Sequence, residues 1–342
     1  MITPLVSIII PVFNEEKYMS QCLDSIINQS YPSEKIEVLV VDGISTDKTC
    51  EIVEDYSKQY NNIFLLYNKK RIAPAAMNIG IRSAKGEVIV RIDGHSYVDK
   101  DFIKNSVEAL DKNEDAWCVG GPIETINTSF VSKAISNGMS SPFGVGNALF
   151  RYSKKQCYVD TLAFGAYYKW VFDKIGYFDE QLVRNQDDEL NYRLIKAGGK
   201  ILLDPKIKSY YYSRSSLKKL WKQYYQYGFW KVRVIQKHKK PASIRHIIPV
   251  TFVLSIIISF FGAIFSKYFS LLFTSIILTY SVLNMLFSLF YGVKNKSKES
   301  ILLPIIFFIL HFSYGFGFLN GLMTFYVFKD KKDVKKNTDI SR

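Results

Sequence analysis

The sequence of 342 residues predicts an α/β protein with a Rossmann-like, mostly parallel sheet, followed by a C-terminal region of transmembrane helices. Two observations carry this prediction. In the first 92 residues, short runs rich in Val and Ile alternate with amphipathic stretches, which is typical of βαβ units with helices on both faces of a sheet. Near the C-terminus, residues 247–328 are almost free of charge outside one short Lys-rich link, which is typical of membrane-spanning segments.

The α/β part begins with apolar strands of the kind that a sheet covered on both faces requires. The expected strands are residues 6–11, 36–41, 63–67 and 88–92, and the helices between them are residues 15–28, 47–56 and 75–83. After residue 93 this alternation fades. There we expect helices at residues 102–110, 170–175 and 189–197, a strand at 116–121, an edge strand at 200–203 and a mobile Gly- and Ser-rich loop at 136–146.

Three apolar runs near the C-terminus, residues 247–265, 271–291 and 301–328, have about the length that a helix needs to cross a bilayer. A buried pair of soluble helices would explain one such run, but three in succession favour membrane insertion. Three full crossings would place the Lys-rich tail outside the cell, against the positive-inside tendency. A third run that is re-entrant or interfacial, with breaks at its glycines, would return the tail to the cytosol. The sequence is compatible with both arrangements.

The formal net charge of +14 is concentrated next to these apolar runs. Residues 217–246 contain nine Lys or Arg and no Asp or Glu, and the tail at 329–342 is also rich in Lys. A basic block beside an apolar one predicts contact with an anionic membrane lipid surface, and the lack of a groove-reading motif argues against nucleic acid. We therefore expect an α/β domain at 1–230, a basic juxtamembrane segment at 231–246, membrane helices at 247–328 and then the basic tail.

The cysteines and the N-terminus bear on the compartment. Cys22, Cys50, Cys118 and Cys157 show neither CxxC nor zinc-ligand spacing, which predicts reduced thiols in a reducing compartment. The first apolar run, residues 6–12, is too short for a signal peptide and has no basic region before it. We expect a multi-pass protein of the cell (inner) membrane whose α/β domain faces the cytoplasm.

Asp93 and His95 follow the fourth strand, and Gly94 between them lets the backbone turn closely. Ligands of open α/β sheets bind beyond the carboxyl ends of the strands, so an oxygen and a nitrogen can converge there on a divalent cation. Mg²⁺ favours oxygen ligands, whereas Mn²⁺ tolerates imidazole better. On this stretch alone, an Asp-Gly turn that carries a surface histidine explains the same residues equally well.

Polar residues also follow the first two strands. Asp42 ends the second strand, and residues 11–16 end the first, so a carboxylate and a polar loop are placed to hold a nucleoside. There is no GxGxxG and no GxxxxGK[ST], so the sequence supports neither a dinucleotide site nor a P-loop triphosphate site. A diphosphate bound here would need a cation, which Asp93 and His95 could position.

A third acidic cluster, residues 185–194, opens a predicted helix. Carboxylates in a first turn are favoured by the helix dipole alone, so a purely structural role also explains them. Near the metal site, an ionised carboxylate of this cluster could take a proton from an attacking hydroxyl.

Together these motifs resemble the inverting nucleotide-sugar glycosyltransferases of family 2, which have the GT-A fold. The resemblance covers about residues 5–233. Residues 41–49 (VDGISTDKT) are similar to the family's D-[DG]-x-S-x-D-x-T signature, and Asp93-Gly94-His95 stands where most members carry Asp-x-Asp. That departure, with residues 120–122 (GGP) and 178–180 (FDE), is most similar to the membrane-associated glucosyltransferases of succinoglycan-type polysaccharide assembly.

The resemblance implies a role for each matching residue. Asp42 would bind the base, Asp47 would shape the nucleotide pocket, and Asp93 with His95 would serve a divalent cation, Mg or Mn. Asp187 would be the catalytic base, with Asp188 as the second candidate. The remaining residues implied in nucleotide-sugar binding are Pro11, Phe13, Asn14, Glu15, Arg71 and Asn78.

Residues 223–227 (QYYQY) stand where some members of that family have Gln-x-x-Arg-Trp. Gln226 replaces the Arg and Tyr227 replaces the Trp. Because the family pattern accompanies processive synthases, its loss favours the addition of a single sugar. The same stretch also fits an interfacial helix with snorkelling lysines, and the aromatic residues are compatible with either reading.

The resemblance implies an enzyme that moves glucose from UDP-glucose onto a polyprenyl-diphosphate-linked saccharide in surface polysaccharide biosynthesis. Two alternatives are a polyprenyl-phosphate glycosyltransferase, whose acceptor is the lipid phosphate itself, and a catalytically inactive membrane scaffold. A phosphate acceptor is already ionised, so it would hardly need a base at Asp187.

Overall fold

The computed structural model describes residues 3–212, 216–241, 243–328, 334 and 337. The chain forms two compact units. The α/β unit comprises residues 1–126 and 149–212, and the helical unit comprises residues 127–148 and 213–342. The predicted domain limit at residue 230 stays a prediction.

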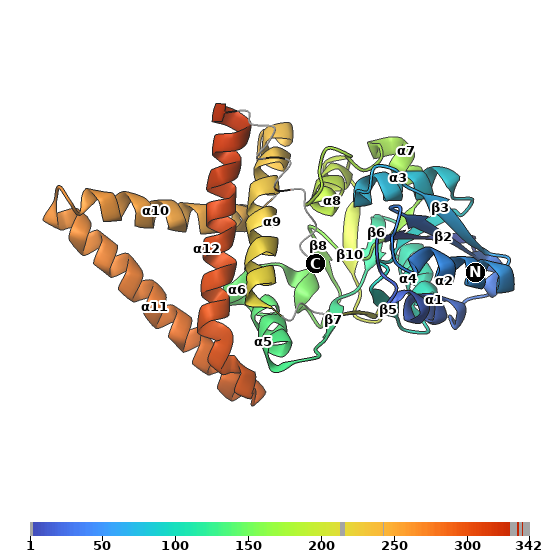
Figure 1. Ribbon diagram of the computed structural model, residues 1–342, viewed down its shortest axis with the longest axis horizontal. Helices are drawn as coiled ribbons and strands as arrows, with labels where there is room; N and C mark the ends of the chain where they lie inside the picture. The colour runs from blue at the N-terminus through green and yellow to red at the C-terminus, as the bar shows by residue number, and fades with distance from the viewer. Residues whose placement is uncertain (1–2, 213–215, 242, 329–333, 335–336, 338–342) are drawn as a thin grey trace. The chain divides into compact units, whose positions relative to one another are not determined.

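An eight-stranded sheet forms the centre of the α/β unit, in the order β3-β2-β1-β4-β9-β6-β10-β8. Figure 1 labels five of these strands, β3, β2, β6, β10 and β8. The strands β1 to β4 are mutually parallel, β6 and β10 are parallel to each other, and β9 and β8 run antiparallel to their neighbours. The bounds are β1 Val6–Val12, β2 Ile36–Asp42, β3 Ile63–Tyr67, β4 Val88–Arg91, β6 Ala116–Gly120, β8 Cys157–Val159, β9 Ala166–Tyr168 and β10 Lys200–Leu203. A second sheet has the order β5-β11-β7, with β5 Ser96–Val98, β7 Ile123–Ile126 and β11 Ser209–Tyr212.

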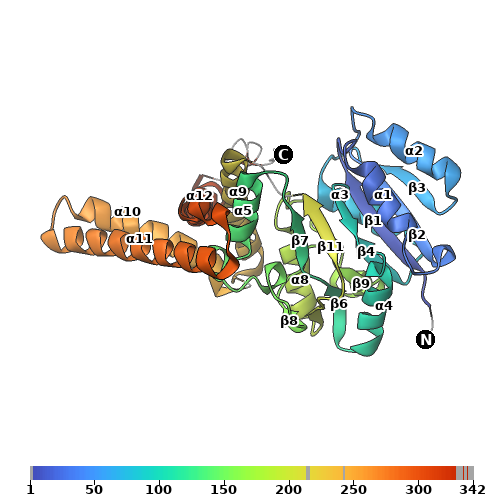
Figure 2. The ribbon, with the colours of Figure 1, turned by 90° about the horizontal axis from the view of Figure 1, so that it is seen from below.

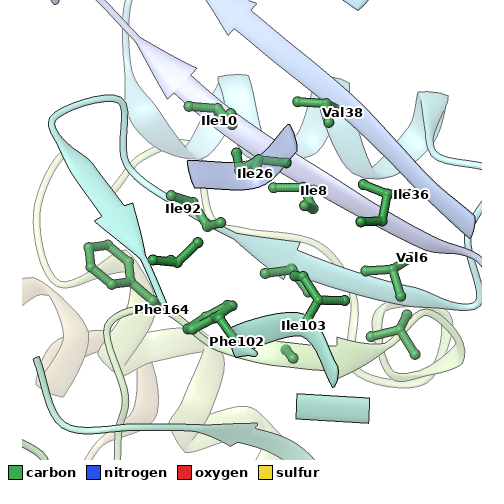
Figure 3. Close-up of a cluster of buried hydrophobic side chains, with 14 of the residues drawn as sticks. Val6, Ile8, Ile10, Ile26, Ile36, Val38, Ile92, Phe102, Ile103 and Phe164 are labelled. Atoms are coloured by element: carbon green, nitrogen blue, oxygen red, sulfur yellow. The ribbon is translucent and has the colours of Figure 1, made fainter. Parts of the chain in front are cut away.

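Helices cover both faces of the large sheet, as predicted. Their bounds are α1 Met19–Ile27, α2 Thr49–Gln59, α3 Ala73–Ser83, α4 Phe102–Lys112, α7 Trp170–Ile175 and α8 Gln186–Lys196. Successive side chains of β1 point to opposite faces, so Ile8 and Ile10 pack with α1 and α4 (Figure 3), whereas Ile9 packs with α3. Because both faces are buried, the inner strands consist almost wholly of apolar residues.

Two sequence-based expectations for this unit are wrong. Residues 200–203 form β10, which lies between β6 and β8 and is therefore not an edge strand. Residues 136–146 are not a loop of the α/β unit, because they contribute to two helices of the helical unit, α5 Phe130–Met139 and α6 Pro142–Val145. The glycines there are packing contacts: a Cβ on Gly138 would lie 2.5 Å from Ile306.

The helical unit contains α9 Leu217–His238, α10 Ile248–Gly262, α11 Lys267–Asn295 and α12 Leu303–Leu322, which continues as a π-helix over Met323–Phe328 (Figures 1 and 2). Among the described residues, three helical segments are long and apolar enough to cross a membrane by length and composition: Ile244–Gly262, Lys267–Asn295 and Lys298–Phe328. They overlap the three predicted apolar runs.

The glycines of α12 do not break it, contrary to one of the two arrangements that the sequence allowed. They allow α9 and α12 to pack closely along each other (Figure 1). A Cβ on Gly317 would lie 2.0 Å from the Tyr225 carbonyl oxygen, and one on Gly228 of α9 would lie 2.1 Å from the Tyr314 carbonyl oxygen. The topology of α12 in the membrane stays a prediction, but its glycines have a packing role.

The α5–α6 segment (Asn127–Ala148) is fastened to the helices that follow it in the same unit. Lys133 pairs with Glu299 at 2.9 Å. The Phe143 ring stacks on Phe287, with 4.6 Å between ring centroids, and the Phe143 carbonyl oxygen lies 2.8 Å from His311 Nε2. A segment inserted between β7 and β8 therefore belongs to the core of the helical unit.

Candidate active site

The site residues predicted from three strand ends lie at one edge of the sheet. The strand β1 pairs with β2 in the register Val12↔Asp42, and with β4 in the register Ile9↔Arg91. Because the three strands are parallel, the residues that follow them emerge side by side. Gly94 makes this proximity tight, since a Cβ there would lie 2.6 Å from Val12 Cγ1.

The loops after β1 and β2 are joined by reciprocal hydrogen bonds through Asn14. Its backbone N–H donates to Ser45 Oγ at 2.9 Å, and its side-chain Oδ1 accepts from the Thr46 N–H at 2.8 Å. Asn14 has φ +55°, in the left-handed region that asparagine tolerates better than most residues. Asp42 is fully buried and accepts hydrogen bonds from the N–H and hydroxyl of Ser45. In this structure Asp42 therefore shapes the loop, and its predicted contact with a base stays a prediction.

Asp47 is a second link between these loops. Its carboxylate accepts from the Glu16 N–H at 3.1 Å and from the N–H and hydroxyl of Thr49 at 3.0 and 2.6 Å. These hydrogen bonds lower the pKa of Asp47 below its ordinary value, although burial opposes them. The Thr49 hydroxyl oxygen in turn accepts from the Glu15 N–H at 2.8 Å. Asp47 thus holds the two loops in a fixed arrangement, and its predicted role in the nucleotide pocket stays a prediction.

Arg71 and Asn78 lie in different surroundings. Arg71 has φ +55°, and its guanidinium carbon lies 5.8 Å from the centroid of the Phe13 ring, so these two predicted site residues are neighbours. Asn78 is buried in α3, and its amide pairs with the backbone N–H and carbonyl of Phe178 at 2.9 Å each. It also donates to Glu180 Oε1 at 2.9 Å. The structure shows Asn78 anchoring the loop before α8; its predicted nucleotide contact is untested.

His95 is buried beneath the loop after β1. Its Nδ1 lies 3.3 Å from Glu15 Oε1, and its ring meets the edge of Tyr211 with 5.4 Å between centroids. This placement makes His95 an inward-facing residue rather than the surface histidine of a simple turn.

Arg91 connects the end of β4 to α8. It is 8% exposed, and its Nε and Nη2 both lie 3.0 Å from Asp93 Oδ1. Its Nη1 donates to Asp187 Oδ1. One guanidinium therefore brings together the predicted metal carboxylate and the predicted base.

Asp187 lies in the first turn of α8, and its side chain is 27% exposed. Burial raises the pKa of Asp187 to about 6, and the negative charges of Asp93 and Asp188 act in the same direction, whereas Arg91 opposes them. A carboxylate with this pKa is ionised at neutral pH and basic enough to accept a proton, which suits a general base.

Two buried polar networks fix α8 and with it Asp187. Glu189, which is fully buried, pairs with Arg193 at 2.8 Å, and Arg193 donates to the carbonyl oxygens of Gly176 and Tyr177 at 3.0 and 2.7 Å. Asn191 accepts from the Tyr167 hydroxyl of β9 at 2.9 Å. The helix that carries the candidate base is therefore tied both to the preceding loop and to the sheet.

Comparison with known proteins places the chain. The sequence profile of Glycosyl transferase family 2 matches residues 7–174. A curated relative from Methanococcus voltae, named dolichyl N-acetyl-alpha-D-glucosaminyl phosphate 3-beta-D-2,3-diacetamido-2,3-dideoxy-beta-D-glucuronosyltransferase, is 34% identical over 325 residues, which are 93% of this chain and 97% of that protein. This chain belongs to glycosyltransferase family 2.

Two further similarities agree with this assignment. The succinoglycan biosynthesis protein ExoA of Rhizobium meliloti (strain 1021) is 29% identical over 246 residues, which are 71% of this chain and 74% of that protein. The mannosyltransferase PcManGT from Pyrobaculum calidifontis, solved in complex with GDP-Man and Mn²⁺, superposes with a TM-score of 0.58 at 17% identity, over 94% of this chain and 88% of that one. The family 2 enzyme therefore has the GT-A fold, as the resemblance implied.

The donor set of this glycosyltransferase fits a cation that arrives with a diphosphate. Within the described parts of the chain, no three His, Cys, Asp or Glu side chains are grouped so that they could hold a metal ion. Mg²⁺ sites that act on phosphates commonly use one or two carboxylates and complete the shell with phosphate oxygens and water. Asp93 suits this arrangement, because Arg91 contacts only its Oδ1, and Oδ2 has no hydrogen-bond partner among the described residues.

Arg91 is the site residue for which the sequence-based reasoning assigned no role. The available signal was a charge in an otherwise apolar buried strand, since a guanidinium in that position needs anionic partners. The Glu189–Arg193 pair was also missed, although its four-residue spacing on the predicted helix is typical of an ion pair.

Proposed function

We propose that this glycosyltransferase is an inverting enzyme that transfers a sugar, with UDP-glucose as the first donor to test, onto a polyprenyl-linked saccharide in surface polysaccharide biosynthesis. The observation that carries the proposal is the grouping of Asp187, Arg91 and Asp93 beside the joined loops after β1 and β2. A carboxylate able to accept a proton is thereby connected to a carboxylate suited to a cation and diphosphate.

The acceptor class is supported by the relatives and by the helical unit. The name of the Methanococcus voltae protein describes a dolichyl-linked N-acetylglucosaminyl phosphate, and the Rhizobium meliloti protein is named for succinoglycan biosynthesis. Three helices suited to membrane insertion would hold the enzyme at the surface where a lipid-linked acceptor resides. We propose that the α/β unit faces the cytoplasm, where nucleotide sugars are made.

The chemistry follows from the residues of the α/β unit. Asp187 accepts the proton of an acceptor hydroxyl, whose oxygen forms a bond with the anomeric carbon of the donor sugar. The bond from that carbon to the diphosphate oxygen breaks, and its electron pair leaves with the nucleoside diphosphate. Asp93 and His95 would hold the divalent cation, which as a Lewis acid offsets the charge that develops on the departing diphosphate. Attack opposite the leaving group inverts the anomeric centre.

The test is Asp187→Asn in the full-length protein, assayed with radiolabelled sugar donors and membranes that carry lipid-linked saccharides. We expect donor binding to weaken by no more than several-fold and transfer to fall by at least about a hundredfold, the usual size of a general-base effect. Asp188→Asn is the matched control and should retain most of the activity. Full transfer by Asp187→Asn would instead indicate an acceptor that is already ionised, such as a polyprenyl phosphate.

A panel of donors tests the sugar separately. The relative from Methanococcus voltae is named for a diacetamido-glucuronosyl group rather than glucose. Transfer from UDP-glucose but not from UDP-glucuronic acid derivatives would support glucose, and the opposite preference would reject it.

A further inference from the structure

Arg91 is a charged residue in a buried strand that is otherwise apolar. It belongs to β4, whose other residues are Val88, Ile89 and Val90, and it lies in register with Ile9 of β1. Its side chain is 9% exposed, so water does not solvate the guanidinium. A buried cation persists only when anions and hydrogen-bond acceptors surround it closely.

The partners of Arg91 come from two distant parts of the chain. Nε and Nη2 converge on Oδ1 of Asp93, two residues away, and Nη1 donates to Oδ1 of Asp187, which is 96 residues away in sequence. The planar fork of a guanidinium suits such a bridge, because its donors point in fixed directions. One positive charge is thus shared between two carboxylates.

The proposed function adds a second cation to this arrangement, and the present inference rests on that proposed function. A divalent ion on Asp93 would stand beside the guanidinium that already contacts Asp93 Oδ1. Two positive charges in contact with one carboxylate repel each other, and the repulsion is strong where burial limits screening. The Arg91 guanidinium can still keep its ion pair with Asp187.

We propose that Arg91 is a positioning residue that pairs Asp93 with Asp187 in the donor-free enzyme and passes wholly to Asp187 when a divalent cation binds Asp93 together with the nucleotide. The same side chain then contacts the carboxylate of the base alone once the donor has bound. Coupling of this kind is reciprocal, so changes at residue 91 or residue 187 alter cation affinity as well as turnover.

The test measures Mn²⁺ binding in the presence of saturating UDP, by electron paramagnetic resonance or calorimetry, with the full-length protein in detergent. Arg91→Met removes the competing charge at similar length, and the Kd for Mn²⁺ should fall about tenfold while transfer falls at least about a hundredfold. Arg91→Lys keeps the charge but not the fork, so the Kd should stay within about threefold of wild type while kcat falls. An unchanged or higher Kd in Arg91→Met would overturn the proposal.

Asp187→Asn provides a second measurement that does not depend on the folding of Arg91→Met. Without the second carboxylate, Arg91 pairs more strongly with Asp93, so Mn²⁺ should bind several-fold more weakly than in wild type. An unchanged Kd in this variant would contradict the proposal. Equal Mn²⁺ binding by wild type and Arg91→Met rejects only the role of Arg91. If neither wild type nor Arg91→Met binds Mn²⁺ in the presence of UDP, both the cation of the proposed function and the role of Arg91 are rejected.

Discussion

The pH dependence of transfer is the most direct consequence of the placement of Asp187. Burial and the nearby charges of Asp93 and Asp188 raise the pKa of Asp187 to about 6, against the opposing effect of Arg91. A general base acts only when ionised, so activity should be present above this pKa and lost as the pH falls through it. The ionised fraction is about 97% at pH 7.5, about half at pH 6 and about a tenth at pH 5.

The assay is kcat/KM for the donor, measured by transfer to a lipid-linked acceptor between pH 5 and 8 at constant ionic strength. Mn²⁺ is kept below its Kd, because kcat/KM then reports the ionisation of the cation-free enzyme. We expect a plateau above about pH 7 and a tenfold loss for each unit well below pH 6. Asp188→Asn removes one of the negative charges that raise the pKa of Asp187, so its inflection should move to lower pH. A wild-type profile that stays flat down to pH 5 would refute the reasoning, because it would mean that no group with the pKa of Asp187 limits the reaction.

Three further variants test the packing around the site and in the helical unit. Gly228→Ala should lower the thermal-unfolding temperature and the yield of folded protein in detergent, because the added Cβ would lie 2.1 Å from the Tyr314 carbonyl oxygen; normal yield and stability would show that α9 and α12 can separate at little cost. Glu189→Ala leaves Arg193 without its fully buried partner, so the free energy of unfolding measured by calorimetry should fall by about 3 kcal/mol, and kcat should also fall. An unaltered kcat would show that Glu189 does not help to position Asp187. Lys133→Ala breaks an ion pair whose lysine is 52% exposed, so the thermal-unfolding temperature should hardly change, and a large fall would indicate a stronger fastening than the geometry gives.

The sheet and its helices could be predicted where burial leaves a signal in the sequence. The parallel strands β1, β2 and β4 are buried on both faces and consist mainly of apolar residues. The edge strand β3 has the predicted bounds Ile63–Tyr67, although Phe64 and Tyr67 are exposed. The strands β5, β8 and β9 have three residues each, too few for any periodicity to show. The sequence predicts a loop at residues 136–146 because Gly and Ser usually indicate loops, whereas in the structure Gly138 and Gly144 allow close helix packing.

The acidic residues of the candidate site could be proposed from the sequence, but the contacts between them could not. Asp93 and Asp187 follow from strand-end and helix-start positions and from the family resemblance. The bridge between them depends on Arg91 and a sequence separation of 96 residues, which no local pattern encodes. Similarly, the spacing of Asp42 and Ser45 fits the family signature, but only the structure shows that the serine donates a hydrogen bond to each oxygen of the buried carboxylate.

The route of the chain through its two units has a practical outcome for protein production. Because Asn127–Ala148 packs with helices that come more than a hundred residues later, cutting the chain at residue 212 would deprive that segment of its partners. The buried side chain of Ile135 and the ring of Phe143 would then be exposed to water on the truncated protein, and exposed apolar surface promotes aggregation. To obtain a soluble enzyme, the α5–α6 segment should therefore be replaced by a short linker, in addition to removing the C-terminal helices.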